Sequence, residues 1–359
     1  MFISALGAIT GKENRLGLPR VKNACVILVD GLGSANIQFR AGHAPTIASQ
    51  LTVDGSITCG FPSTTVSSLA SFSTGVRPGI HGMVGYQVRD SGSGEQINLL
   101  TGISSAEQAQ FWQGQTTVAE IAKAQDVTCH FVGPSEYDGS GFTMATMRGA
   151  KYVAAKTIED RFKAAHKIMA AGPNNLVYLY VPELDQKAHA YGFKSAQWVE
   201  KLEDLDAELK KFLKQLPANA GALLTADHGI VDVPVENQIH IDELGLQGIE
   251  WVGGDPRVLF LYLKDSESAK TRAALQDYLG KRAYVATKDE LVAAGWFGEV
   301  LAPALKRLPD LFLIALGSTA LYHREFAKPK SLQMIGHHGS VSAEELTIPL
   351  LKFGGFAKN

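Results

Sequence analysis

Short apolar runs alternate with segments of helical period along most of the chain, and this alternation constrains the fold more than any other feature. The clearest helical segment, residues 198–216, places leucines and aromatic residues three or four positions apart, with Glu and Lys on the other face. Strands that alternate with helices form a mostly parallel sheet covered on both faces. We therefore predict a doubly wound α/β fold, as a single domain over residues 1–359. Its buried strands are expected at residues 24–29, 127–132, 176–181, 222–224, 258–263 and 311–316.

One part of the chain departs from this spacing. The segment at approximately residues 240–325 lies between two groups of motifs that we connect with function. It includes strand-like and helix-like stretches of its own. We predict that this part forms a small inserted α+β lobe that covers the site.

Size and charge narrow the classes of function. The chain has 359 residues, of which 45% are hydrophobic and 19% charged, so it can bury a sizeable core. A formal net charge of -2 without a long basic run argues against nucleic acid or an anionic membrane as a partner. Residues 1–17 lack the pattern of a signal peptide, and no apolar stretch approaches the length of a membrane span. We expect a cytoplasmic protein.

The three cysteines give no sign of a disulfide framework or a thiolate metal site. Cys25, Cys59 and Cys129 lie far apart, and none belongs to a Cys-x-x-Cys pair. We expect them to be buried free thiols.

Ionisable side chains follow three of the predicted strands. Asp30 comes directly after the first strand in "VILVDGLG", and Asp227 and His228 follow another in "LLTADHG". Asp185 follows a third, and His189 lies one helical turn further on. Because ligands of open α/β sheets bind beyond the carboxyl ends of the strands, we expect these side chains to lie close together.

Two adjacent histidines, His337 and His338, lie in the Gly-rich stretch "MIGHHGS" near the C-terminus. Neighbouring side chains on an extended segment point apart, so we expect one of the two at most to be a ligand. Carboxylates combined with neutral imidazoles are the ligand set of zinc and similar cations, whereas calcium and magnesium prefer oxygen alone. The six or seven candidate ligands suffice for two ions.

Each candidate also has an ordinary structural explanation. A strand-end aspartate often caps the next helix, and a histidine beside glycine is often a surface residue. Metal binding is favoured because four separate segments supply such residues. We expect Asp204 and Asp206 to face solvent on the polar side of the 198–216 helix. The histidines without a strand-end partner are expected to be mostly structural, and they are His43, His81, His130, His166, His240 and His323.

The stretch "GFPSTTVSSLASFSTGVRPGIHG", residues 60–82, is rich in hydroxyl groups. Its helical part begins after Pro62, which places Ser63, Thr64 or Thr65 near the first helical turn. A hydroxyl there is close to free backbone N–H groups and the positive end of the helix dipole, which suits attack on a phosphate. The alternative is an ordinary N-cap, and this stretch alone does not decide between them.

Five motifs in this order are similar to those of the alkaline phosphatase superfamily, in particular its type I phosphodiesterase/nucleotide pyrophosphatase branch. They are "VDG", "FPSTT…STG…PGIHG", "ELDQKAHAYG", "TADHG" and "HHGS", between residues 30 and 340. The resemblance implies an alkaline-phosphatase-like fold and a site for two zinc ions, with Mn²⁺ or another divalent metal as the alternative. It also implies a small phosphate ester or nucleotide as substrate and a threonine that becomes covalently phosphorylated or nucleotidylated.

The resemblance divides the candidate ligands between two ions. One zinc would be held by Asp185, His189 and His338, and the other by Asp30, Asp227, His228 and the hydroxyl of Thr65. Thr65 is preferred to Thr64 as nucleophile because the family nucleophile lies ten residues before the glycine of a Thr-Gly pair, here Gly75.

One position departs from the family pattern. An asparagine that contacts the phosphate commonly lies three residues after the nucleophile, and here that position is Ser68. A serine hydroxyl can donate a hydrogen bond as well, but from a shorter side chain. The preference among diester, pyrophosphate and monoester therefore stays open. Further candidates for binding phosphate are Arg77, Arg89, Arg148 and Arg257.

Other functions are compatible with the same residues. The site could hydrolyse phosphomonoesters or phosphonates such as phosphonoacetate, and a metal-dependent phosphomutase or a non-catalytic nucleotide or metal sensor could share its ligands. A sulfatase is a poor fit, because "CGFPST" at residues 59–64 lacks the arginine and the proline spacing of a formylglycine motif.

Overall fold

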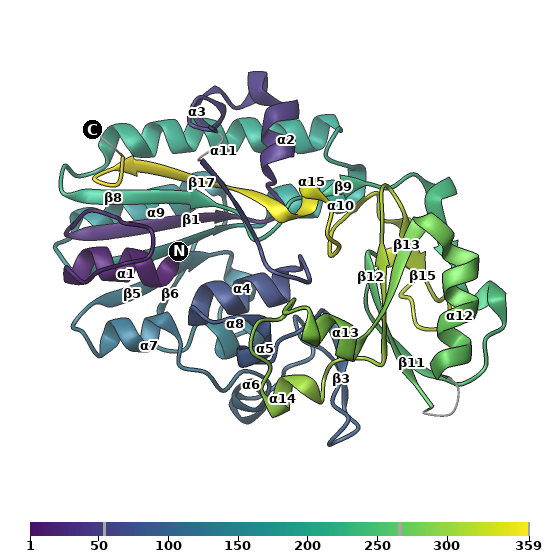
Figure 1. Cartoon of the computed structure of the whole chain (residues 1–359). Helices are drawn as coiled ribbons and strands as arrows, with labels where there is room; N and C mark the ends of the chain where they lie inside the picture. Colours follow the sequence, from purple (N-terminus) through teal and green to yellow (C-terminus); the bar gives the residue numbers. More distant parts are fainter. Residues whose placement is uncertain (53–54, 265–267, 358–359) are drawn as a thin grey trace.

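The predicted alternation of strands and helices produces a seven-stranded sheet in the computed structural model, which describes residues 1–52, 55–264 and 268–357. The strand order is β2-β17-β8-β1-β7-β5-β6, and the strands from β8 to β6 in this order are parallel (Figure 1). β17 pairs antiparallel with β8, and β2 pairs antiparallel with β17. The mostly parallel sheet is therefore confirmed. Its strands are β1 (Asn23–Val29), β2 (Ser56–Thr58), β5 (Thr128–Gly133), β6 (Lys151–Ala154), β7 (Asn175–Val181), β8 (Ala220–Thr225) and β17 (Thr347–Gly354).

Helices cover both faces of this sheet, as the doubly wound prediction requires. Successive side chains of a strand point to opposite faces. On one face Val26 and Leu28 of β1 join a core with α1, α4 and α7, and on the other face Ile27 and Val29 join a core with α9 and α11. Burial on both faces explains why β1 is a continuous apolar run. These helices are α1 (Phe2–Thr10), α4 (Thr65–Thr74), α7 (Val118–Lys123), α9 (Ile158–Ala170) and α11 (Ala196–Gln215).

The long helix α11 confirms one predicted surface residue and corrects another. Asp204 is exposed, as predicted. Asp206 is buried, and its carboxylate accepts hydrogen bonds from the backbone N–H groups of Thr46 (3.2 Å) and Ile47 (2.8 Å). These groups lie in the first turn of α3 (Pro45–Ala48), where no helical carbonyl is available to them. The prediction for Asp206 was wrong because this partner is distant in the sequence.

A second sheet of four antiparallel strands, in the order β11-β12-β14-β13, lies beside the first (Figure 1). Two of the six apolar runs predicted as strands, 258–263 and 311–316, lie in this sheet as β12 and β14. β11 and β12 are antiparallel because the turn between them is too short for a parallel crossover. The sheet packs on α12 (Ser268–Leu279) around a core of its own. Its description as an inserted lobe at 240–325 stays a prediction. The strands are β11 (Ile249–Asp255), β12 (Val258–Leu263), β13 (Ala283–Thr287) and β14 (Leu311–Ala315).

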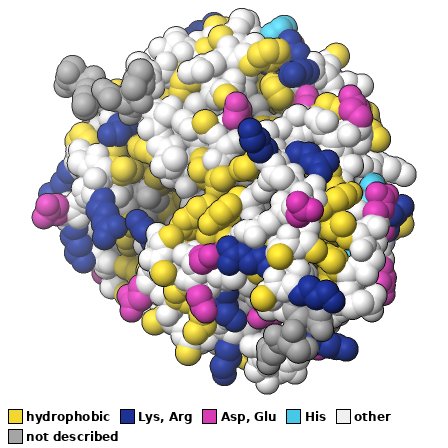
Figure 2. Space-filling view, turned by 45° about the vertical axis from the view of Figure 1, so that its right-hand side comes forward, with side chains coloured by type: hydrophobic (Ala, Val, Ile, Leu, Met, Phe, Trp, Pro, Cys, Tyr) yellow, Lys and Arg dark blue, Asp and Glu magenta, His cyan; other side chains and the backbone are white. Residues whose placement is uncertain are grey.

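Shorter elements surround the junction of the two sheets. Those that contribute to the site or its surroundings are α8 (Gly141–Thr146), α10 (Glu183–Tyr191), β9 (Val231–Asp232), β15 (Ala320–Tyr322), β16 (Gly336–His337) and α15 (Ala343–Leu346). On the face drawn in Figure 2, acidic and basic side chains are interspersed and hydrophobic side chains gather near the centre. Within the described ranges, no helix combines the length and the apolar composition that crossing a membrane requires.

All three cysteines are free thiols, as predicted. Cys25 and Cys129 are buried, whereas Cys59 is only partly buried.

Candidate metal centre and active site

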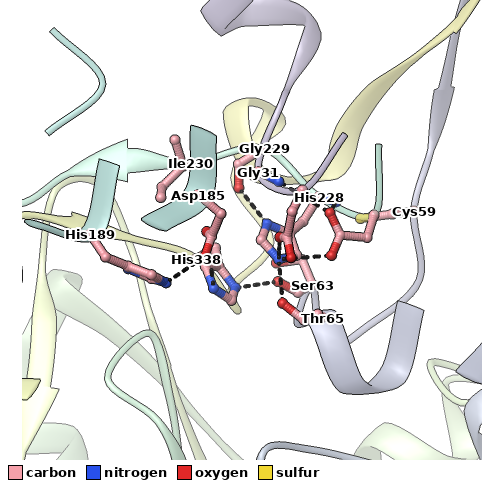
Figure 3. Close-up of polar contacts among 12 residues, drawn as sticks. Gly31, Cys59, Ser63, Thr65, Asp185, His189, His228, Gly229, Ile230 and His338 are labelled. Carbon is pink, nitrogen blue, oxygen red and sulfur yellow. Dashed lines mark hydrogen bonds and ion pairs between the residues drawn. The ribbon is translucent and has the colours of Figure 1, made fainter. Parts of the chain in front are cut away.

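Three neighbouring strands of the main sheet bring the predicted donors together. β1 lies between β8 and β7 and is parallel to both, so the carboxyl ends of the three strands are adjacent. Asp30 directly follows β1, Asp185 lies in the first turn of α10 after β7, and Asp227 and His228 follow β8. His338 reaches the same place from the end of β16 (Figure 3).

The first group of donors consists of Asp185, His189 and His338, with one ligand atom from each within 4.8 Å of the others. Asp185 and His189 lie one turn apart on α10, with Nε2 of His189 3.1 Å from Oδ2 of Asp185. Nε2 of His338 lies 3.8 Å from the other carboxylate oxygen, Oδ1. The structure thus places these three side chains as one cluster.

The second group surrounds His228. Its Nε2 lies 3.5 Å from Oδ1 of Asp30, 3.4 Å from Oδ2 of Asp227 and 3.1 Å from Oγ1 of Thr65. A ligand atom of Asp185 also lies within 4.8 Å of those of Asp30 and His228, so Asp185 belongs to both groups. Asp227 also orients the loops around it, because its Oδ1 accepts hydrogen bonds from the N–H groups of Gly31 and His228.

The three imidazoles are held in one tautomer. Nδ1 of His189 lies 2.8 Å from the carbonyl of Gly336, and Nδ1 of His228 lies 3.1 Å from the carbonyl of Gly229. Nδ1 of His338 lies 3.0 Å from the carbonyl of Ser63 (Figure 3). Because a carbonyl only accepts, each Nδ1 carries a proton, and in the neutral form of each ring Nε2 is the nitrogen with the lone pair that faces the carboxylates. Second-shell hydrogen bonds of this type orient histidines that bind metals.

The carboxylates have buried oxygens without hydrogen-bond donors. Asp30 Oδ1, Asp185 Oδ1 and Asp227 Oδ2 have no hydrogen-bond partner among the described residues. Burial and the neighbouring Asp227 and Asp185 raise the pKa of Asp30 well above its usual value. Burial and the neighbouring His228 lower the pKa of His338 well below its usual value. Partner-free carboxylates that face imidazole lone pairs fit divalent cations, which would compensate the charges.

Thr65 is the first residue of α4, so the helix begins where the sequence predicted. Its hydroxyl donates to Nε2 of His228, since the other ring nitrogen carries the proton. The preceding Ser63 is fully buried, and it connects this turn to the loop of His338. Its hydroxyl donates to the carbonyl of Ser340 (2.7 Å) and accepts from the N–H of Gly339 (3.1 Å). The nucleophile candidate and one ligand loop therefore support each other.

A cavity of about 1060 Å³ opens beside these groups. Asp30, Thr65, Asp185, His189 and His338 line one part of it. Much of the remaining wall is aromatic or apolar and comes from α4, β5, β7 and α8, and it includes Phe72, Phe131, Phe142, Met147, Tyr178 and Tyr180. The site can therefore hold an organic group next to a reacting phosphate.

Several predicted substrate contacts lie elsewhere. Ser68 does not line the cavity, although its Oγ is buried and has no hydrogen-bond partner among the described residues. None of the four candidate arginines lines the cavity either. Arg89 pairs with Glu250, Arg148 donates to backbone carbonyls, and Arg257 pairs with Glu345. His323, expected to be structural, does line the cavity.

Tyr180 and Asp255 are among the residues of the cavity wall that the prediction from sequence missed. Tyr180, in β7, donates a hydrogen bond to Oδ2 of Asp30. Asp255, at the end of β11, lines the cavity and follows two glycines in "VGGDP". A carboxylate at a strand end next to glycine was the signal used for Asp30, and Asp255 carries the same signal.

The fold and the donors at the carboxyl ends of its strands define an alkaline-phosphatase-like hydrolase. The model of the type I phosphodiesterase / nucleotide pyrophosphatase family matches residues 24–341, and the chain belongs to this family. It is therefore a hydrolase of the nucleotide pyrophosphatase/phosphodiesterase type. No curated protein sequence matches the chain.

Solved structures show the same fold. Murine ectonucleotide pyrophosphatase/phosphodiesterase 5 superposes with a TM-score of 0.73 at 18% identity, over 92% of this chain and 88% of the murine one. The human protein of the same name gives a TM-score of 0.72 at 16% identity, over 94% and 90%. A further structure is an inactive threonine-to-alanine variant of the murine protein in complex with AMP, with a TM-score of 0.73 at 18% identity, over 92% and 88%.

Proposed function

We propose that the chain is a two-zinc hydrolase that cleaves phosphodiester or pyrophosphate bonds through a covalent intermediate on Thr65. One observation supports this proposal above the others. The Thr65 hydroxyl lies at the N-terminus of α4, on the cavity wall and 3.1 Å from Nε2 of His228, within a cluster of three carboxylates and three imidazoles.

The donor set supports zinc as the metal. Asp185, His189 and His338 would hold one ion, and Asp30, Asp227, His228 and Thr65 the other. When bound, two divalent cations would favour ionisation of the Thr65 hydroxyl and stabilise the charges on the attacking and leaving oxygens. Manganese is the alternative to be tested by metal analysis.

The residues of the chain would carry out the reaction in two displacements. In the first, Oγ1 of Thr65 releases its proton to solvent and bonds to phosphorus, while the bond from phosphorus to the leaving oxygen breaks on the opposite side and that oxygen takes up a proton from solvent. In the second, water bonds to phosphorus and loses a proton while the bond to Oγ1 breaks and Oγ1 takes up a proton, which restores the Thr65 hydroxyl and gives net retention at phosphorus. The free N–H groups in the first turn of α4 would stabilise the phosphoryl oxygens.

Acid quenching during turnover tests the covalent step. Peptide mapping by mass spectrometry should find the phosphoryl or nucleotidyl group on Thr65, and Thr65→Ala should lower kcat by several orders of magnitude while most of the metal stays bound. Thr65→Ser should keep part of the activity. An adduct on Thr64 or Ser63 would show that this residue is the nucleophile in place of Thr65. Full activity of Thr65→Ala would exclude the covalent mechanism.

A substrate panel separates this function from its alternatives. The zinc-loaded protein should hydrolyse bis-p-nitrophenyl phosphate and p-nitrophenyl thymidine monophosphate faster than p-nitrophenyl phosphate and phosphonoacetate. The AMP complex of the murine neighbour supports a nucleotide as the first natural substrate to test. Preference for p-nitrophenyl phosphate would indicate a phosphomonoesterase, and preference for phosphonoacetate would indicate a phosphonatase. Isomerase activity without hydrolysis would indicate a phosphomutase, and tight binding without turnover a sensor.

A further inference from the structure

Arg161 and Glu183 form an ion pair between α9 and the first turn of α10. The Arg161 side chain is fully buried, and the Glu183 side chain is 21% exposed. Glu183 lies two residues before Asp185 on the same helix. The pair therefore ties the start of the helix that carries Asp185 and His189 to α9, a helix without any of the candidate ligands.

This ion pair leaves some of its polar atoms without hydrogen bonds. Nη2 of Arg161 contacts Oε1 of Glu183, and Nη1 lies 3.5 Å from the carbonyl of Lys156. Nε of Arg161 and Oε2 of Glu183 have no hydrogen-bond partner among the described residues. Replacing a buried ion pair with apolar side chains is often neutral or stabilising. Stability alone therefore does not explain why this position carries two charges.

Direct contact with a substrate or a metal ion does not explain the charges either. Among the described residues, the cavity wall and the donor groups include neither Arg161 nor Glu183. The Arg161 side chain has no exposed surface that a phosphate could reach. Any effect of the pair on the site must therefore pass through α10.

Helix geometry places the ion pair and the candidate ligands on different sides of α10. Successive residues of a helix are about 100° apart, so Glu183 and Asp185 project from nearly opposite sides. Asp185 and His189 share one face, with Nε2 of His189 3.1 Å from Oδ2 of Asp185 (Figure 3). Leu184 and Ala188 pack in the core, but apolar contacts have no preferred direction. The ion pair is directional, so it fixes the rotation of α10 about its axis.

The rotation of α10 matters because Asp185 belongs to both donor groups. Oδ2 of Asp185 faces His189 on the same helix, whereas Oδ1 lies 3.8 Å from Nε2 of His338, which follows β16. A rotation of α10 would move Asp185 and His189 together, away from their present positions relative to His338. The ion held by these three residues would be affected most, because two of its ligands come from α10.

We propose that Arg161 and Glu183 are positioning residues of the metal centre: their ion pair fixes the rotation of α10 and thereby directs Asp185 and His189 toward the ion that they share with His338. This inference rests on the proposed function, because it takes Asp185 and His189 as metal ligands. It goes beyond that function by giving a role to two residues that contact neither the metal nor the substrate.

A variant without the two charges tests the inference. The apolar variant, Arg161→Met with Glu183→Leu, leaves no buried charge without its partner. The control variant, Lys163→Met with Glu159→Leu, removes an exposed ion pair from the same helix, α9. Competition with a chelator measures the affinities for zinc, and urea unfolding of the metal-free protein measures stability.

The apolar variant should bind one of its two zinc ions about tenfold to a hundredfold more weakly, the range expected when a contact that orients a ligand is lost. Its urea midpoint should equal or exceed that of the wild type, and the control variant should keep both zinc affinities. Unchanged zinc affinity in the apolar variant would overturn the inference. A loss of affinity accompanied by a lower urea midpoint would make the pair a stabilising contact and overturn its positioning role.

Arg161→Lys supplies a rescue experiment. The guanidinium contacts Glu183 through a single nitrogen, which an ammonium group can replace. Arg161→Lys should therefore keep most of the zinc affinity that Arg161→Met loses. An equal loss in both variants would mean that the contact with Glu183 does not determine the affinity, and it would overturn the inference.

Two further measurements do not depend on turnover. In the Co²⁺-loaded protein, the visible absorption, which depends on ligand geometry, should change in the apolar variant and not in the control variant. If the wild type binds no divalent metal, the proposed function fails, and amide hydrogen exchange of the metal-free protein decides the role of the pair. The amides of α10 should then exchange faster in the apolar variant while those of α11 do not, and equal exchange of α10 in both proteins would overturn the inference.

Discussion

Arg257 and Glu345 form a fully buried, two-pronged ion pair, with Nε of the guanidinium 3.0 Å from Oε1 and Nη2 2.6 Å from Oε2 of the carboxylate. Arg257 lies in the turn between β11 and β12, whereas Glu345 lies in α15. Oε1 of Glu345 also accepts the N–H of Ser340, and its backbone carbonyl accepts the N–H of Gly229. The pair therefore joins the second sheet to the two loops that carry His228 and His338.

Replacing the Arg257 side chain should destabilise the protein and weaken the packing of the loops that carry His228 and His338. Arg257→Met leaves the Glu345 carboxylate buried without its charged partner, which costs about 3–5 kcal/mol. Urea unfolding of the metal-free protein measures this loss. As a control, Arg89→Met breaks a partly exposed pair with Glu250 and should change the free energy of unfolding by only about 0–1 kcal/mol. Equal effects of the two substitutions would contradict the structural role.

The two adjacent histidines should differ in their effect on metal binding. Nδ1 of His337 lies 2.9 Å from the carbonyl of Ile335 and its Nε2 lies 2.7 Å from the hydroxyl of Tyr322, so both nitrogens have partners. His338 instead presents Nε2 to Asp185. His338→Ala should lose roughly one bound ion per chain, and His337→Ala should keep both, by mass-spectrometric metal analysis. Loss of metal in His337→Ala but not in His338→Ala would mean that His337 is the metal ligand and His338 is not.

Tyr180 should increase the affinity of the site for its metal. Its hydroxyl donates to Oδ2 of Asp30 and orients the carboxylate from the cavity wall. Tyr180→Phe should weaken metal binding by about tenfold to a hundredfold, as measured by competition with a chelator. Tyr178, two residues earlier on β7, is also buried, and its hydroxyl forms no hydrogen bond with a described residue. Tyr178→Phe is the matched control, and an equal effect would refute the role of Tyr180.

The donors at the ends of parallel strands could be predicted from the sequence because parallel pairing decides their position. Any side chain just after β1, β7 or β8 must reach the same edge of the sheet, whatever the connections between the strands. Asp30, Asp185 and Asp227 each follow an apolar run that is easily identified. Local periodicity was therefore sufficient for this part of the site.

Contacts between distant segments could not be predicted in this way. Asp206 caps a helix at residues 45–48, and Arg257 finds Glu345 at the other end of the chain. Nothing in the neighbouring residues indicates these partners. Asp255 is a different case, because it belongs to an antiparallel hairpin whose position beside the parallel sheet follows from tertiary packing. Its strand-end signal was present, but it did not indicate that the residue reaches the cavity.

His81 should make the stability of the protein depend on pH. The side chain is buried, Nδ1 accepts the N–H of Met83 (3.1 Å), and Nε2 lies 2.9 Å from the hydroxyl of Ser71. Burial lowers the pKa of His81 from 6.5 to about 3. The unfolded chain therefore binds a proton below about pH 6.5 that the folded protein binds only near pH 3, so stability is lost as the pH falls through this window.

In the metal-free protein, the contribution of His81 to the free energy of unfolding should fall by up to about 1.4 kcal/mol per pH unit between pH 6 and pH 4. Urea unfolding at several pH values measures this slope. His81→Gln should be less stable at pH 8, because it replaces a well-packed ring, but its stability should fall less steeply toward acid. His43→Gln, at an exposed position, should keep the wild-type slope. An identical slope in the wild type and His81→Gln would mean that the folded protein accepts a proton on His81, and that the ring is not kept neutral by burial.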